Sequence, residues 1–191
     1  MTHFSFTYRN ADLEAYSDFR QQIRRFLSRD PAAQTPRADC WSQFDAGFSR
    51  RLAEEGLLGL TWPKQYGGQE RSALERFILL EELLAAGVPV AAHWISERQV
   101  GPLLLRYGTE AQKEAYLPAI LRAELFFCIG LSEPDSGSDL ASLRTRADRT
   151  DGGWIVNGRK IWTSNAHRSH FMVLLCRTSP GSQRHQGLSQ L

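Results

Sequence analysis

The chain has 191 residues, 42% hydrophobic and 23% charged, values that are ordinary for a globular protein and argue against disorder. Its 23 Lys and Arg against 21 Asp and Glu leave a formal net charge of +2, which gives no electrostatic basis for a nucleic-acid partner. We expect no membrane span, because no apolar run approaches ~18 residues, and no signal peptide at residues 1–10. Three scattered cysteines, Cys40, Cys128 and Cys176, are typical of free thiols in a reducing compartment, so a soluble cytoplasmic protein is predicted.

The first part of the chain has helical periodicity. Residues 11–29 and 41–55 are predicted helices, because apolar side chains recur every three to four positions. Asp30-Pro31 should end the first, since the residue before a proline avoids the helical conformation, and Gly56 should end the second. The glycine- and proline-containing residues 57–71 are a predicted loop.

Two capping boxes mark further helix starts. In SALE at residues 72–75 and TEAQ at residues 109–112, a hydroxyl and a side chain three positions later can satisfy the free amides of a first helical turn. They predict helices that reach about residue 86 and about residue 122. Residues 90–107 form another helical stretch, in which we expect a kink at Gly101-Pro102.

The period changes after residue 124. LFFCIGL at 125–131 and HFMVLLCRT at 170–178 have strand length, and GLSQL at the end of the chain looks like the start of another strand. Asn157-Gly158 lies between two β-rich runs and predicts a hairpin turn. We therefore predict two parts: an N-terminal all-α helical domain, residues 1–124, and an incomplete β domain, residues 125–191.

Residue patterns alone leave the chemistry open. The serine-rich stretch SEPDSGSD at 132–139 lacks the second glycine of a nucleophile elbow, which disfavours a serine hydrolase. His167 and His170 are three residues apart near a predicted strand, which disfavours a shared metal, and we expect none. The acids Glu133, Asp135 and Asp139 are more typical of turn formers than of a general base.

The same stretches can also hold a planar cofactor such as a flavin. FFCIGL supplies an apolar strand before Ser132, and Gly137 permits a small anion nest. GRKIWTSNA supplies Trp162 for packing and two hydroxyls, on Thr163 and Ser164. A core tryptophan and a purely structural Gly-Ser turn are the more common interpretations of such residues, so the pattern does not decide between them.

Two motifs together resemble the acyl-CoA dehydrogenase family. The family patterns are apolar-Thr/Ser-Glu-Pro-x-x-Gly-Ser-Asp and Lys-x-Trp-x-Thr/Ser-Asn, and this chain reads LSEPDSGSD at 131–139 and KIWTSN at 160–165. GLLGLTWPKQYGG at 56–68 and YGTEAQKEAYLPAI at 107–120 also look like that family's helical domain. The resemblance implies a helical domain followed by a β-barrel-like domain, with the family's C-terminal four-helix bundle absent.

The resemblance implies FAD as cofactor and α,β-dehydrogenation of an acyl-CoA thioester, in fatty acid or lipid breakdown. The resemblance implies that Ser138 lies near both the cofactor's pyrophosphate and the substrate. Ser132 and Ser164 stand where threonine is more frequent in the family, and each keeps a hydroxyl. The residues implied at the cofactor are Ile129, Gly130, Leu131, Ser132, Gly137, Ser138, Trp162, Thr163 and Ser164.

The resemblance also implies what lies elsewhere. In the family the carboxylate base comes from the C-terminal bundle, so no catalytic residue is expected in this chain, and the isolated chain should be inactive. The implied partners are an acyl-CoA substrate, an electron-transferring flavoprotein as acceptor, and further subunits of a homo- or hetero-oligomer. Two alternatives stay open: an inactive truncated paralogue that binds a full subunit, and a flavin oxidase or monooxygenase on the same fold.

Overall fold

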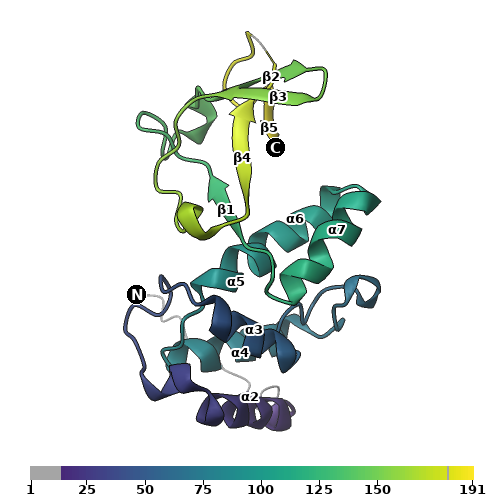
Figure 1. Ribbon diagram of the computed structural model, residues 1–191, viewed down its shortest axis with the longest axis vertical. Helices are drawn as coiled ribbons and strands as arrows, with labels where there is room; N and C mark the ends of the chain where they lie inside the picture. The colour runs from purple at the N-terminus through teal and green to yellow at the C-terminus, as the bar shows by residue number, and fades with distance from the viewer. Residues whose placement is uncertain (1–13, 180) are drawn as a thin grey trace, which may run out of the picture. The chain divides into compact units, whose positions relative to one another are not determined.

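The computed structural model describes residues 14–179 and 181–191, so the start of the predicted helix 11–29 lies outside the described residues. The chain forms two compact units that divide between Ala91 and Ala92. The first is helical, and the second contains further helices and a mixed β-sheet (Figure 1). The predicted order of helical part and sheet is therefore confirmed, while the domain boundary near residue 124 stays a prediction.

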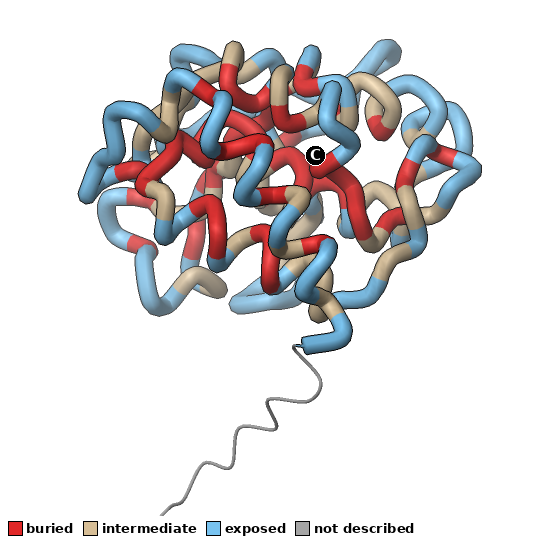
Figure 2. The backbone as a smooth tube through the Cα atoms, turned by 90° about the horizontal axis from the view of Figure 1, so that it is seen from below, coloured by how far each residue is buried: buried red, intermediate tan, exposed pale blue. Residues whose placement is uncertain are grey.

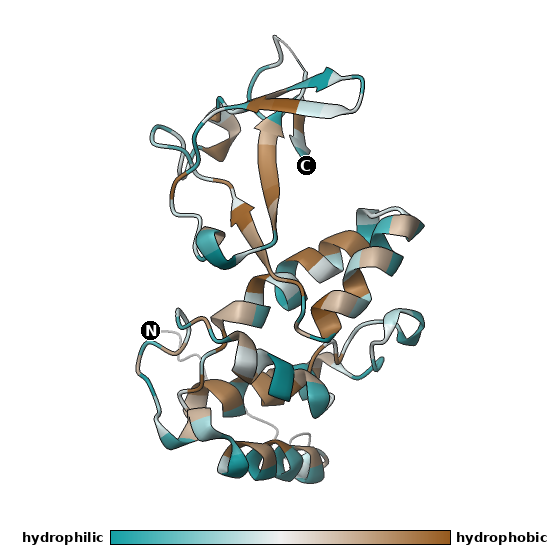
Figure 3. Ribbon diagram, in the orientation of Figure 1, coloured by the Kyte–Doolittle hydropathy of each residue, from teal (hydrophilic) through white to brown (hydrophobic). Residues whose placement is uncertain are grey.

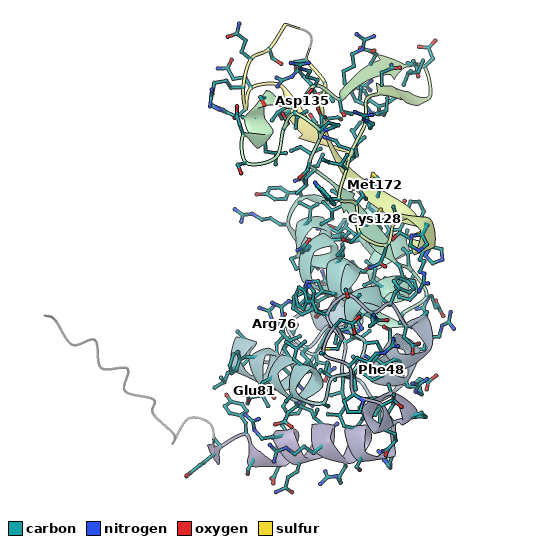
Figure 4. The ribbon with its side chains drawn as sticks, turned by 90° about the vertical axis from the view of Figure 1, so that its left-hand side faces the viewer. Phe48, Arg76, Glu81, Cys128, Asp135 and Met172 are labelled. Carbon is teal, nitrogen blue, oxygen red and sulfur yellow. The ribbon has the colours of Figure 1, made fainter. Side chains whose placement is uncertain are left out.

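The first unit is a small helical core. Its helices are α2 (Ser17–Arg29), α3 (Ala46–Glu54) and α4 (Ala73–Ala85), with 3-10 turns at Pro31–Gln34 and Lys64–Tyr66. The Phe26 and Phe48 rings lie 6.1 Å apart, and Phe48 is fully buried. Figure 2 shows in red the buried positions along the backbone, and Figure 4 labels Phe48. The other fully buried large side chains of this unit include Ile23, Leu52, Trp62, Ile78 and Leu83.

Local signals fix most of the helix ends. Gly56 has a φ of +69°, and Ser72 closes the predicted capping box with Glu75 at the start of α4. The predicted helix 41–55 is wrong at its start, because the carboxylate of Asp45 accepts a hydrogen bond from the Phe48 amide (2.9 Å) and so caps α3 there. Trp41 consequently lies before the helix and is half-exposed.

The helices of the second unit follow the predicted stretch 90–107. They are α5 (Ala91–Ile95), which starts at the division, a π-helical segment (Ser96–Val100) and α6 (Gly101–Tyr107). The predicted kink at Gly101-Pro102 stays a prediction: Gly101 has helical dihedral angles, and the departure from α-helical geometry is the π-helical segment directly before it. α7 (Glu110–Leu121) begins at the second predicted capping box.

The sheet has the order β1-β4-β2-β3, with β5 paired to β4. Its strands are β1 (Phe127–Gly130), β2 (Arg146–Thr150), β3 (Gly153–Asn157), β4 (Phe171–Arg177) and β5 (Leu188–Gln190). β1 and β4 run parallel, so that Cys128 lies opposite Met172, as Figure 4 shows. Both strands are hydrophobic along most of their length (Figure 3). In the described part of the chain no helix is long and apolar enough to cross a membrane.

The predicted hairpin turn at Asn157-Gly158 is wrong. The hairpin joins β2 to β3 through Asp151-Gly152, and β3 ends at Asn157. Glycine is needed at position 158 for a steric reason, because a Cβ there would lie 2.2 Å from Thr145 Oγ1. The chain then leaves the sheet, so the KIWTSN motif lies in a loop.

Candidate functional site

A buried ion pair joins the two motifs that the sequence singled out. Lys160 Nζ lies 2.9 Å from Glu133 Oε1, and both side chains are under 10% exposed. The same ammonium donates to the carbonyl oxygen of Leu131 (2.8 Å), and the Ile161 amide donates to the carbonyl oxygen of Ser132 (2.9 Å). The start of residues 160–165 is therefore held against the start of residues 131–139.

The Glu133 carboxylate is an anchor and not a proton acceptor. It also accepts hydrogen bonds from the backbone amides of Arg144 (2.7 Å) and Thr145 (2.9 Å). Burial by itself would raise the pKa of Glu133, but the hydrogen bonds from Thr145, Arg144 and Lys160 outweigh it and hold the pKa at about 2. The side chain stays ionised near neutral pH, and both oxygens are already occupied.

The rest of the first motif is a loop held at Ser136. Ser136 is buried, its hydroxyl lies 2.6 Å from that of Ser142, and its backbone exchanges two hydrogen bonds with Glu133. Gly137 and Ser138 are exposed, and Gly137 has no positive φ, so the left-handed conformation of an anion nest is not adopted. A Cβ at Gly137 would meet nothing within 4 Å, so a ligand can approach this backbone closely.

The second motif presents an exposed tryptophan beside an unsatisfied hydroxyl. Trp162 is 86% exposed and has a φ of +58°, so its interpretation as a core residue is wrong. Thr163 Oγ1 is buried and has no hydrogen-bond partner among the described residues. Ser164 is exposed, and its amide donates to the carbonyl oxygen of Trp162 (3.0 Å). An exposed indole next to a buried, unsatisfied hydroxyl is the surface expected of a site that a ligand or further protein completes.

The close packing of the Lys160 side chain over β1 requires a glycine at position 130. A Cβ at this position would lie 2.8 Å from Met172 Sδ and 3.3 Å from Lys160 Cγ, so the glycine makes room for the lysine stem over β1. Ile129 and Leu131, on either side of it, are half-buried. The structure thus brings Ile129–Ser132 together with the start of KIWTSN.

The two histidines nearest the second motif lie in different environments. His170 accepts a hydrogen bond at Nδ1 from the Phe126 amide (3.0 Å) and stacks on the Phe126 ring, while His167 is exposed. No group of three or more His, Cys, Asp or Glu side chains among the described residues is arranged to hold a metal ion. Sequence reasoning missed the Lys160–Glu133 pair; its only signal was that LSEPDSGSD contains three acidic residues and KIWTSN contains one lysine.

Two hollows lie in the second unit. An apolar pocket of about 470 Å³ is lined by α6, α7, β1, β4 and β5, with Tyr116, Phe127 and Phe171 in mutual ring contact, and it can take an apolar group. The other hollow, about 580 Å³, surrounds Arg177. That guanidinium already donates to five backbone carbonyl oxygens, those of Ala141, Leu143, Ser182, Arg184 and Gln186, which is a structural role.

Comparison with known proteins assigns both parts of the chain. The N-terminal domain of acyl-CoA dehydrogenases matches residues 14–124, and their middle domain matches residues 128–191. Acyl-CoA dehydrogenase FadE29 of Mycobacterium tuberculosis is 44% identical over 175 residues, which cover 92% of this chain and 44% of the relative.

Solved structures agree with this assignment. The Tcur3481-Tcur3483 steroid ACAD matches with a TM-score of 0.83 at 37% identity, over 98% of this chain and 48% of that one. A glutaryl-CoA dehydrogenase of Mycobacterium smegmatis in complex with FADH2 matches with a TM-score of 0.72 at 26% identity, over 87% and 43% of the two chains. The chain spans about half the length of the relatives that it matches.

Proposed function

Because the chain belongs to the acyl-CoA dehydrogenase family, we propose that residues 125–191 present one wall of the FAD site of an enzyme that dehydrogenates acyl-CoA thioesters. The observation that carries this proposal is the buried Lys160–Glu133 pair, which holds the two motifs together and leaves Trp162 facing solvent. We assign residues 1–124 to the helical domain and residues 125–191 to the middle domain.

The residues present fit a flavin. The exposed Trp162 indole offers a flat apolar face, and the unsatisfied Thr163 hydroxyl offers a hydrogen bond to a ring edge. The open backbone at Gly137 suits a phosphate group, and Ser138 beside it is proposed to meet both phosphate and substrate. The remaining proposed contacts are the backbone of Ile129, Gly130 and Leu131 and the hydroxyls of Ser132 and Ser164.

These residues orient the cofactor and do not transfer the proton. When bound, FAD supplies the acceptor for the hydride that leaves the β-carbon. Trp162 would exclude water from one side of the ring, while the Lys160–Glu133 pair fixes the loop that carries Ser132. Glu133 is ionised and fully engaged in hydrogen bonds, so it is not the base. Following the family pattern, in which the base comes from the C-terminal bundle, we propose that the carboxylate that removes the α-proton comes from outside these residues.

The partners follow from the same proposal. The substrate is an acyl-CoA, and the electron acceptor is an electron-transferring flavoprotein. The protein works as a homo- or hetero-oligomer, and the base comes from a polypeptide segment outside these 191 residues. The apolar pocket of about 470 Å³ supports an apolar acyl group as the substrate's variable part.

FAD titration of the purified chain tests the cofactor assignment. We expect weak binding, detected as quenching of flavin fluorescence, and about tenfold weaker binding by Trp162→Ala, because stacking on an aromatic face contributes about 1–3 kcal/mol. Trp41→Ala is the matched control, since Trp41 is a half-exposed tryptophan of the other unit, and its affinity should be unchanged. Absence of binding, or equal losses in both variants, would contradict the assignment.

Turnover tests the position of the base. The FAD-loaded chain, given acyl-CoA thioesters and an artificial electron acceptor, should show no dehydrogenation. Dehydrogenation would show that a base lies within the 191 residues, and hydrogen peroxide formation would favour an oxidase.

A further inference from the structure

One guanidinium joins two loops of the second unit. Arg177 is the last residue of β4, and it donates to the carbonyl oxygens of Ala141 (3.1 Å) and Leu143 (3.3 Å), in the segment between β1 and β2. It also donates to carbonyl oxygens of the loop between β4 and β5, those of Ser182 (3.1 Å), Arg184 (3.0 Å) and Gln186 (3.0 Å). A planar fork of five N–H donors can hold both loops at once, which the three donors of a lysine cannot match.

The first of these loops carries the exposed tip, residues 137–138, that is proposed to meet phosphate. Ser142 lies directly between the two residues of this loop that Arg177 holds. Its hydroxyl lies 2.6 Å from that of Ser136 and donates to the carbonyl oxygen of Asp139 (2.8 Å). Because these two contacts flank the exposed tip, its position depends on where Arg177 holds the turn.

The second loop turns its carbonyl groups toward Arg177 through uncommon backbone conformations. Arg184 has a φ of +52°, which a residue other than glycine keeps only where its surroundings stabilise it. The Arg184 side chain lies 3.9 Å from the carboxylate of Asp139 and so joins the same two loops. Both of these side chains are more than 60% exposed, so this ion pair is weak, and Arg177 is the stronger connection.

We propose that Arg177 is a positioning residue for the cofactor site: it fixes the exposed tip, and it makes the tip depend on the loop between β4 and β5. The inference rests on the proposed function, in which Gly137 and Ser138 meet phosphate. Arg177 acts through the loop and not on the phosphate itself. The four N–H groups of its two terminal nitrogens already face six acceptor oxygens within 3.3 Å.

Amide hydrogen exchange of the chain without FAD tests the connection between the loops. In Arg177→Ala the amides of Ser142 and Gln186, one in each loop, should exchange at least about fivefold faster, because both loops lose their shared donor. Arg177 lines the hollow of about 580 Å³, so free guanidinium can reach the vacated position. Guanidinium chloride at about 20 mM, far below denaturing concentrations, should restore both rates to within about twofold, whereas sodium chloride should not. The Ile161 amide, bonded to Ser132, is the internal control and should exchange unchanged.

FAD titration tests the effect on the site. Arg177→Ala should weaken FAD binding about tenfold, because the exposed tip is no longer held in place, and about 20 mM guanidinium should restore most of the affinity. Arg177→Lys keeps the positive charge but not the fork, so it should still weaken binding at least about threefold. Arg184→Ala is the matched control, since it removes an exposed arginine side chain of the same loop and keeps the carbonyl group. Its affinity should stay within about twofold of the original.

The outcomes separate this inference from the proposed function. Trp162→Ala tests the cofactor site independently, and guanidinium should not restore its binding. If Trp162→Ala weakens FAD binding and Arg177→Ala does not, the site stands and the positioning role is wrong. Unchanged exchange in Arg177→Ala, or an equal loss of affinity in Arg184→Ala, would also overturn it. A chain whose loops respond to Arg177 but which binds no FAD contradicts the proposed function, and the positioning role falls with it. If circular dichroism shows that Arg177→Ala does not fold, Arg177→Lys carries both measurements.

Discussion

The helical unit and the sheet region both pair a buried acid with a base, but they differ in how far tryptophan side chains are buried. In the helical unit Trp62 and Phe48 are fully buried, and Glu82 is paired with Arg20 and Arg24. In the sheet region Trp162 is 86% exposed, all of β3 is exposed, and the buried Lys160–Glu133 ion pair positions a loop. The difference indicates that the helical unit completes its own core, while the sheet region presents surfaces for other molecules.

Alanine substitution of one tryptophan in each region should give the largest difference in unfolding free energy. Trp62→Ala should lower the free energy of unfolding by about 3–5 kcal/mol, because it empties a fully buried site. Trp162→Ala should change it by less than about 0.5 kcal/mol, because the indole faces solvent. Urea denaturation followed by circular dichroism measures both; similar losses in the two variants would remove the contrast.

The buried ion pair gives the next largest effect. Lys160→Met keeps the stem that packs over Gly130 but removes the ammonium, and it should cost about 3 kcal/mol, because Glu133 is left buried without its counter-charge. Arg29→Ala, which breaks an exposed pair with Glu55, is the control and should cost under about 1 kcal/mol. Equal, small losses in both would show that the pair does not anchor the loop.

Acid should unfold the sheet region through the same carboxylate. The folded pKa of Glu133, about 2, lies below the ordinary value of 4.5, so its contribution is complete above pH 4.5 and is lost as the pH falls toward 2. The shift corresponds to about 3 kcal/mol. Glu133→Gln should therefore flatten the fall in unfolding free energy between these pH values. An unchanged slope in this variant would rule out Glu133 as the source.

Helix capping gives the smallest effect. Thr109→Ala removes the hydroxyl that accepts a hydrogen bond from the Gln112 amide (3.2 Å), and it should lower the free energy of unfolding by about 1 kcal/mol. Thr109→Ser, which keeps the hydroxyl, is the matched control and should lose much less. The same denaturation measurement applies, and a larger loss in the serine variant would contradict the capping role.

Short-range signals predicted the fold well, and contacts between distant residues limited the prediction. The capping boxes at Ser72 and Thr109 and the stop at Gly56 were readable because every group involved lies within a few residues. Asn157-Gly158 misled because the close approach of Thr145, which explains that glycine, comes from another part of the chain. Neighbouring residues alone do not reveal such a contact.

The candidate site shows the same limit. The two motifs identified which stretches matter, but not that Lys160 and Glu133 hold them together, nor that Trp162 is exposed at a left-handed position. The ion pair joins residues 27 positions apart, so only the folded structure reveals it. Whether Ser132, Gly137, Ser138 and Ser164 contact a flavin stays a prediction.

The most direct test of the flavin wall is the NMR spectrum of the five tryptophan indole N–H groups during FAD titration, each assigned by a Trp→Phe variant. The proposed site predicts that the Trp162 resonance shifts most, while that of the fully buried Trp62 stays unchanged. A Trp162 resonance that does not move, or equal shifts at all five indoles, would contradict the claim that KIWTSN faces the cofactor.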